Sequence, residues 1–365
     1  MYNQFLYRQL VFLLVVSIFF SYSITGQESG LYGSRDLDLS TSIHEALYHH
    51  AVQSIDVHDD IVDAQSIDKQ KVIGLLHTRY PELAYSIERT PKQTLEGDEI
   101  SKLMIDILKS ETSTGVGSVG DSFWTSVEGA ELTAEEKSSF KFLYGYSLFK
   151  EKKWDEAQRI FAKIAKERKG EYEYAFYYDG LIALLQKEYG TAHELFTKVG
   201  KDARLATQTP YYLAASHYGL GNYDEIISFY APRLNETHLH NIRGLAQIVG
   251  YAQYKNEDYP GAIASLSKLG SAQELTSEEN YVLGIAYQRI GNHEKSSAHL
   301  SKVQDVQEDI ASKASYEHAL NLAHQQKNAE AIGAFEGLIK SGHTHKHDIH
   351  MNLSLIHISE PTRPY

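Results

Sequence analysis

One feature limits what this chain can fold into: a small side chain returns at an almost constant interval between residues 137 and 340. The six positions are separated by 35, 34, 36, 34 and 35 residues and are occupied by Gly145, Gly180, Ala214, Gly250, Gly284 and Ala319. Self-similarity with a period near 34 is typical of a stacked array of helical hairpins. The interval therefore predicts a row of two-helix units, each of which contacts only its neighbours.

The first two units show the pattern most clearly, because Phe142–Ile164 and Tyr177–Val199 align without a gap. In each unit an aromatic residue begins the second helix and a small residue follows three positions later. Ala157, Phe161 and Ile164 have the spacing that places side chains on one face of a helix. We expect the small side chains to let two helices approach closely, and the aromatic ring to fill the gap to the next hairpin.

The six units resemble tetratricopeptide repeats over about Lys137 to Lys340. The resemblance implies an all-α fold, an α-solenoid in which stacked helical hairpins form a right-handed superhelix. It also implies a protein-binding, non-enzymatic role, in which partners bind to a concave groove. The third unit departs from the family, since Ile226 replaces a small residue and Arg233 an apolar one. We therefore expect less close helix packing there.

Three stretches precede the array, which spans residues 132–340. Residues 1–26 have the basic start, apolar centre and small polar end of a signal peptide, with an uncleaved N-terminal anchor as the alternative. Residues 27–111 are interpreted as divergent helical repeats, with helices over 41–54, 60–79 and 98–109. Residues 112–131 are predicted to be a flexible loop and linker, and a capping box at Thr133 and Glu136 begins the array.

Two stretches follow the array. Residues 341–352 are rich in histidine (His343, His345, His347 and His350) and are interpreted as a solvated linker, with weak binding of zinc, copper or nickel as the alternative. Leu353–Arg363 resembles the translation of a sequencing adaptor. Residues 353–365 are therefore interpreted as an artefact that truncates the natural chain near Asn352, and a genuine tail is the alternative.

Composition and motifs argue against most chemistry. A net charge of −13 disfavours nucleic-acid binding through a general basic field, and the absence of cysteine excludes disulfides and thiolate ligands. Gly115, Gly117 and Gly120 match a dinucleotide fingerprint but lack the preceding strand that such a site needs. His44 and His49 are five residues apart, too far around a helix to share a zinc ion. We predict no catalytic residue, no cofactor and no metal.

Family positions that line the concave groove are rich in tyrosine. The candidate partner-binding residues are Phe142, Tyr146, Tyr174, Tyr177, Tyr211, Tyr218, Tyr251, Tyr254, Tyr281 and Tyr316. Tyrosine combines a large apolar area with a polar tip and suits a wet protein-binding surface. The alternative is that these aromatic rings pack between adjacent hairpins.

One type of partner is disfavoured. Family members that clamp a C-terminal carboxylate carry asparagine at the ninth position, which here is occupied by Tyr146, Leu181, Ala215, Tyr251, Ile285 and Leu320. Leu75–Glu82 and Leu132–Phe149 resemble the start of large repeat proteins secreted by Bacteroidetes-type bacteria. The sequence thus predicts an exported scaffold in the periplasm or at the outer membrane. It would bind proteins or peptides, but no nucleic acid, and have no transmembrane domain in the mature chain. The alternative is the recognition module of a larger enzyme or signalling receptor whose effector domain lies beyond the truncation.

Overall fold

The computed structural model describes the second half of the chain almost completely and the first part in pieces. The described residues are 39, 43–49, 66–76, 81–91, 93–96, 100, 103, 106, 127, 129, 132–167, 172–200, 203–236, 239, 241–269, 274–303, 308–341 and 346–359. The predicted signal peptide and the glycines at 115, 117 and 120 lie outside them. The chain divides into two compact units, Met1–Leu39 and Ser40–Tyr365, and the elements named below belong to the second.

A small sheet precedes the array. Strand β1 (Ser66–Asp68) pairs antiparallel with β2 (Thr94–Glu96), and helices α4 (Lys69–Leu76) and α5 (Pro81–Glu88) lie between them in the chain. The helix predicted over 60–79 is therefore wrong at 66–68, where the backbone bonds to another strand instead of to its own next turn. Residues 43–49 are helical, in agreement with the helix predicted over 41–54.

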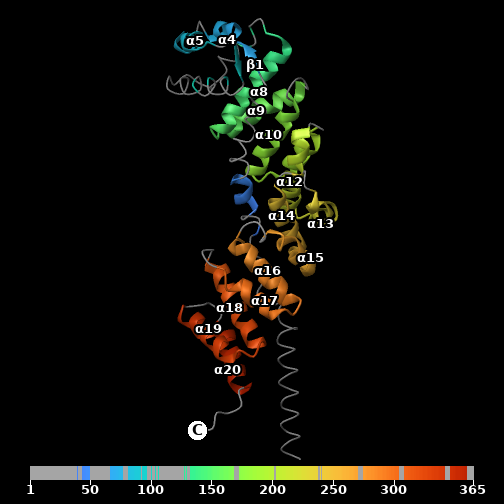
Figure 1. Ribbon diagram of the computed structural model, residues 1–365, viewed down its shortest axis with the longest axis vertical. Coiled ribbons are helices and arrows are strands. Elements are labelled where there is room, and N and C mark those ends of the chain that lie inside the picture. Colours follow the sequence, from blue (N-terminus) through green and yellow to red (C-terminus); the bar gives the residue numbers. More distant parts are fainter. Residues whose placement is uncertain are drawn as a thin grey trace, which may run out of the picture. The chain divides into compact units, whose positions relative to one another are not determined.

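Six helical hairpins follow, as the repeat predicts (Figure 1). The pairs are α8 (Ala134–Lys150) with α9 (Trp154–Glu167), α10 (Tyr172–Leu185) with α11 (Tyr189–Lys198), α12 (Ala203–Gly219) with α13 (Tyr223–Tyr230), α14 (Ile242–Lys255) with α15 (Tyr259–Leu266), α16 (Ser277–Arg289) with α17 (His293–Leu300), and α18 (Glu308–His324) with α19 (Asn328–Lys340). The predicted capping box of Thr133 and Glu136 begins α8. The array is an α-solenoid.

The turn inside every hairpin has the same backbone conformation. One residue with positive φ stands seven positions after each small anchor, at Lys152, Lys187, Gly221, Glu257, Gly291 and Gln326. Its N–H and the next one bond back to carbonyls three and five residues earlier, which is the Schellman pattern that ends a helix. The period of the sequence is therefore also the period of the backbone.

The small anchors are required by close helix contact. A Cβ added to Gly250 would lie 2.5 Å from a side-chain carbon of Leu266, and one added to Gly284 would lie 2.6 Å from Leu300. The third hairpin differs, as predicted: α13 contacts α12 less extensively than the other second helices contact their first helices. There Ile226 is buried in place of a small residue, and the 3₁₀ helix η1 (Pro232–Asn235) follows α13.

The last described element is α20 (Lys346–Ser359), which packs against α19. The linker predicted over 341–352 is thus helical from Lys346. Ile349 and Ile356 are buried, and their seven-residue spacing places them on one helix face, a periodicity that the surrounding histidines obscured. The likeness of 353–365 to adaptor sequence stays a prediction.

Candidate functional site

The first helices of successive hairpins form a continuous row. Helix α10 contacts α12, α12 contacts α14, α14 contacts α16, and α16 contacts α18. The second helix of each hairpin also packs against the first helix of the next one. We call the row from α10 to α18 the first-helix face. Because such a face spans several hairpins, it can contact an extended partner along its length.

An aromatic residue stands three positions before the small anchor in five of the six hairpins, and glutamine stands there in the fourth. These residues are buried: Phe142, Tyr177, Tyr211, Gln247, Tyr281 and Tyr316. Several of them hydrogen-bond side chains in the first helix of the next hairpin or at its start. The Tyr177 hydroxyl donates to Gln208 Oε1 at 2.6 Å, and Tyr211 hydrogen-bonds the side chain of Asn241. These side chains join one hairpin to the next.

Burial raises the pKa of Tyr177 and Tyr211 well above the usual tyrosine value, and raises the pKa of Tyr316 to about 12. These hydroxyls therefore stay neutral at any physiological pH. Tyr316 accepts a hydrogen bond of 3.0 Å from Asn352 Nδ2, so α20 takes the place of a further first helix. The contacts made by tyrosine hydroxyls along the row are insensitive to pH.

The ten predicted groove residues fall into two groups. Tyr174 and Tyr254 are half-buried. The other eight are buried within the array: Phe142, Tyr146, Tyr177, Tyr211, Tyr218, Tyr251, Tyr281 and Tyr316. Packing between hairpins, the alternative given by the sequence, accounts for the buried eight. The partner-binding role of the set stays a prediction, and Tyr174 and Tyr254 are the members with side chains within reach of a partner.

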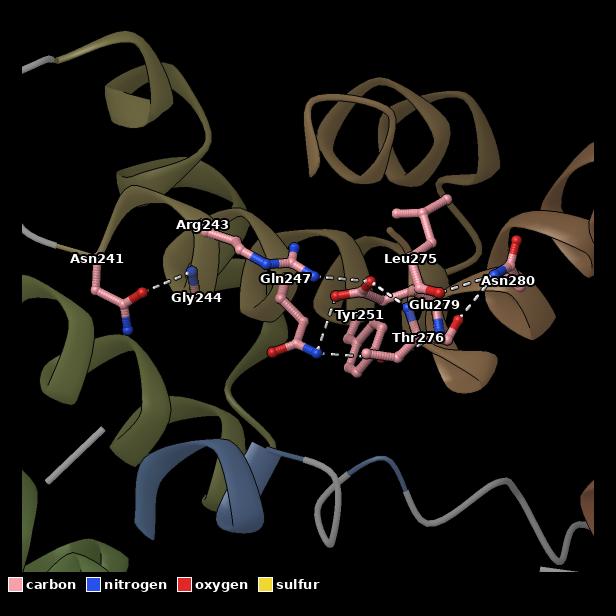
Figure 2. Close-up of polar contacts among 9 residues, drawn as sticks. All are labelled: Asn241, Arg243, Gly244, Gln247, Tyr251, Leu275, Thr276, Glu279 and Asn280. Carbon is pink, nitrogen blue, oxygen red and sulfur yellow. Dashed lines mark hydrogen bonds and ion pairs between the residues drawn. The ribbon is translucent and has the colours of Figure 1, made fainter. Parts of the chain in front are cut away.

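A polar cluster that the sequence analysis did not identify joins α14 to α16 (Figure 2). Glu279 is 1% exposed, and its carboxylate accepts hydrogen bonds from Gln247 Nε2 at 3.2 Å and Arg243 Nη2 at 3.3 Å. It also accepts one from the backbone N–H of Thr276 at 2.9 Å. One carboxylate thus completes a capping box and holds an arginine of the preceding hairpin in place.

The start of α14 fixes the other end of this cluster. Asn241 has a left-handed backbone with φ of 49°, and its Oδ1 accepts a hydrogen bond of 3.0 Å from the N–H of Gly244. Asparagine tolerates this conformation better than most residues. A Cβ on Gly244 would lie 2.6 Å from the Tyr211 ring, so glycine is needed for close approach. Arg243 therefore projects from a rigid helix start.

Two observations on metal ligands and membrane spans concern only the residues that the structure describes. Among the described residues, no three histidine, aspartate or glutamate side chains are placed to hold a metal ion together. Within that same part, no helix combines the length and the apolar character needed to cross a membrane. His350 is exposed on α20, whereas His343 and His345 lie outside the described ranges.

Comparisons with known proteins give only distant structural likenesses. No protein-family model matches the chain, and no curated protein matches it. It is similar to the crystal structure of the APC/C hetero-tetramer Cut9–Hcn1, with 16% identity and a TM-score of 0.38. That likeness covers 92% of this chain and 57% of the other. It is also similar to NprR in complex with its cognate peptide NprX, with 15% identity, a TM-score of 0.34, and coverage of 72% and 82%.

Proposed function

We propose that this chain is a non-enzymatic scaffold that binds partner proteins or peptides on its first-helix face. The observation that supports this most is the unbroken row of first helices from α10 to α18. Binding in repeat proteins depends on such extended surfaces, because each repeat adds a small contact and the contacts add along the row.

Helix α14 presents the side chains best suited to a partner. Arg243 and Tyr254 are eleven residues apart, which is three helical turns, so they lie on the same side of α14 about 16 Å from each other. The Arg243 side chain is 32% exposed and is oriented by Glu279. Arginine and tyrosine are enriched among residues that dominate binding energy, and an arginine already held in place has less freedom to lose on binding.

The partner's contact segment is therefore expected to supply carbonyl or carboxylate oxygens near Arg243 and an apolar group near Tyr254. A guanidinium donates hydrogen bonds and accepts none, so oxygen atoms are the groups that it can bind. A wet interface of tyrosine and arginine fits a peptide or a protein surface rather than a small apolar molecule.

The test is quantitative capture of partners from an extract of the producing cells. We expect Tyr174→Ala combined with Tyr254→Ala to reduce capture at least fivefold, with the helical content unchanged by circular dichroism. Phe229→Ala is the matched control, since it removes an exposed aromatic ring from a second helix. The proposal fails if the double variant keeps its fold and every partner.

We also propose that the scaffold is exported to the periplasm or the outer-membrane face, as a protein of the type secreted by Bacteroidetes. The support is the pattern of residues 1–26, a basic start followed by an apolar run and a small polar end. Mass spectrometry of the protein from a fractionated bacterial culture tests this. A chain that begins near Gln27 in the periplasmic fraction is expected, and an intact chain in the cytoplasm contradicts export.

A further inference from the structure

The residue directly before the small anchor differs in kind along the array. In hairpins three, four and five it is apolar (Leu213, Val249 and Leu283), whereas in hairpins two and six it is titratable, as Asp179 and His318. Both titratable side chains contact the second helix of the preceding hairpin. We call these two contacts the α9–α10 joint and the α17–α18 joint.

The two joints use equivalent partners. Asp179 hydrogen-bonds the side chain of Gln158, and His318 Nδ1 lies 2.8 Å from Ser297 Oγ. Gln158 and Ser297 each stand thirteen positions after the anchor of their own hairpin, since 158 − 145 and 297 − 284 are both 13. The same place in the repeat is thus occupied once by an acid and once by a base.

Asp179 is poorly placed for a charged carboxylate. Asp179 is 6% exposed, and its Oδ1 has no hydrogen-bond partner in the part of the chain that the structure describes. Burial raises its pKa to about 6, and the carboxylate of Glu188, which precedes α11, acts in the same direction. The hydrogen bond to Gln158 of α9 lowers this pKa, with an effect smaller than that of burial and larger than that of Glu188.

His318 is poorly placed for a charged imidazole. Burial lowers its pKa, and Lys327 in the turn before α19 lowers it further. A hydrogen bond with the Ser297 backbone and the carboxylate of Glu330 on α19 oppose this.

Further polar side chains lie in and beside the α17–α18 joint. The rings of His293 and His324 are stacked with centroids 4.5 Å apart. On the α16 side, Glu317 accepts a hydrogen bond of 2.8 Å from Gln288.

We propose that the array is a pH-responsive device in which mild acid tightens the α9–α10 joint and loosens the α17–α18 joint. Because each hairpin contacts mainly its neighbours, the two responses remain local. The proposal does not depend on which partner, if any, the first-helix face binds.

The direction in which each joint's stability changes with pH follows from proton linkage. The pKa of Asp179 is higher folded than unfolded, so its folded state gains stability as the pH falls from about 6 toward 4. The pKa of His318 is lower folded than unfolded, so its contribution is present above about pH 6.5 and is lost as the pH falls below that value. The two responses therefore run in opposite directions as the pH falls below about 6.

Hydrogen exchange of the whole chain tests this, with mass spectrometry at pH 7.5 and 5.0 and correction for the intrinsic exchange rate. We expect protection in α10 to rise roughly tenfold and protection in α18 to fall roughly threefold on acidification. Peptides from α13 and α14 are the internal reference, because the equivalent positions there hold Ile227 and Val249.

Two variants assign each response to its residue. Asp179→Asn is expected to abolish the rise in protection of α10 and to leave α18 unchanged. His318→Gln keeps a polar partner for Ser297 and is expected to abolish most of the loss of protection in α18, with α10 unchanged. The proposal is overturned if wild-type α10 and α18 respond in the same direction or not at all. It is also overturned if either response persists in its own variant. The wild-type comparison remains decisive if a variant does not fold.

Discussion

The two ends of the array solve the same packing problem with opposite chemistry. In the α9–α10 joint, Tyr178 lies against the aromatic rings of Phe142, Phe149 and Phe161, with ring centroids 5.4 to 5.7 Å apart. In the α17–α18 joint, the centre is the fully buried Asn321. The comparison shows that the backbone repeat accepts either filling.

Asn321 shows how the polar joint is satisfied. Its Nδ2 donates to Ser296 Oγ at 2.9 Å and to the Glu317 carbonyl at 2.8 Å, and its Oδ1 lies 2.8 Å from His293 Nδ1. An apolar joint gains free energy in proportion to the area buried, whereas a polar joint gains less, because its hydrogen bonds replace hydrogen bonds to water. We therefore expect the aromatic joint to be the more stable of the two.

The largest expected effect is at the aromatic joint. Phe161→Ala removes a fully buried ring and should lower the free energy of unfolding of the α8–α11 region by about 3–5 kcal/mol. Urea unfolding followed by hydrogen exchange in α9 and α10 measures it. A loss below about 1 kcal/mol would mean that the ring cluster contributes little and would break the comparison.

Asn321→Ala comes next. It leaves the buried Ser296 hydroxyl without its amide donor and His293 without its partner, so we expect a loss of about 2 kcal/mol, confined to α17–α19. Ser315→Ala, at an exposed position of the same helix, is the matched control and should change stability by less than about 0.5 kcal/mol. Equal losses for the two variants would contradict a structural role for the polar centre.

A smaller effect of opposite sign is expected for Asp179→Asn. Since the charged carboxylate is unfavourable in the folded joint, the amide should stabilise the protein by about 1–2 kcal/mol at pH 7.5 and by little at pH 4. Urea unfolding at both pH values measures the difference. Stabilisation that is the same at both pH values would show that the charge of Asp179 is not its cause.

The smallest change in stability is expected at the turns within the hairpins. These turns have the same backbone conformation near the aromatic joint and near the polar joint, so their substitutions should have equal effects. Lys187 and Gln326 have positive φ, so replacing either with glycine should stabilise the chain by about 1 kcal/mol or less. Gly221→Ala should cost a similar amount, because alanine is strained at its φ of 76°. Thermal unfolding of the three variants measures these shifts, and different results for Lys187→Gly and Gln326→Gly would separate the two regions at their turns as well.

The hairpins and their turns could be predicted from the sequence because they depend on residues close in the chain. Aromatic residues such as Trp154 and Tyr259 do begin second helices, and the Thr133 capping box is a local pattern. The strand at Ser66–Asp68 could not be predicted in this way, because its partner lies at 94–96 and the pairing has no local signal.

The candidate site was less predictable for the same reason. The family positions identified Tyr177 and Tyr211 as members of one row, but periodicity alone does not show whether a side chain on a first helix faces a partner or the next hairpin. Glu279 carries the Thr-x-x-Glu pattern of a capping box, which indicates its local bond. Its ion pair with Arg243 spans 36 residues and depends on the register between hairpins.

The central claim is that consecutive hairpins stack in one register. Side chains of one first helix then hydrogen-bond side chains of the first helix in the next hairpin. A double-mutant cycle on the Tyr177–Gln208 hydrogen bond tests it most directly, with Tyr177→Phe, Gln208→Leu and the double variant compared by urea unfolding. The account predicts a coupling free energy of about 1–2 kcal/mol between these residues. A coupling within error of zero, with all three variants folded, would contradict it.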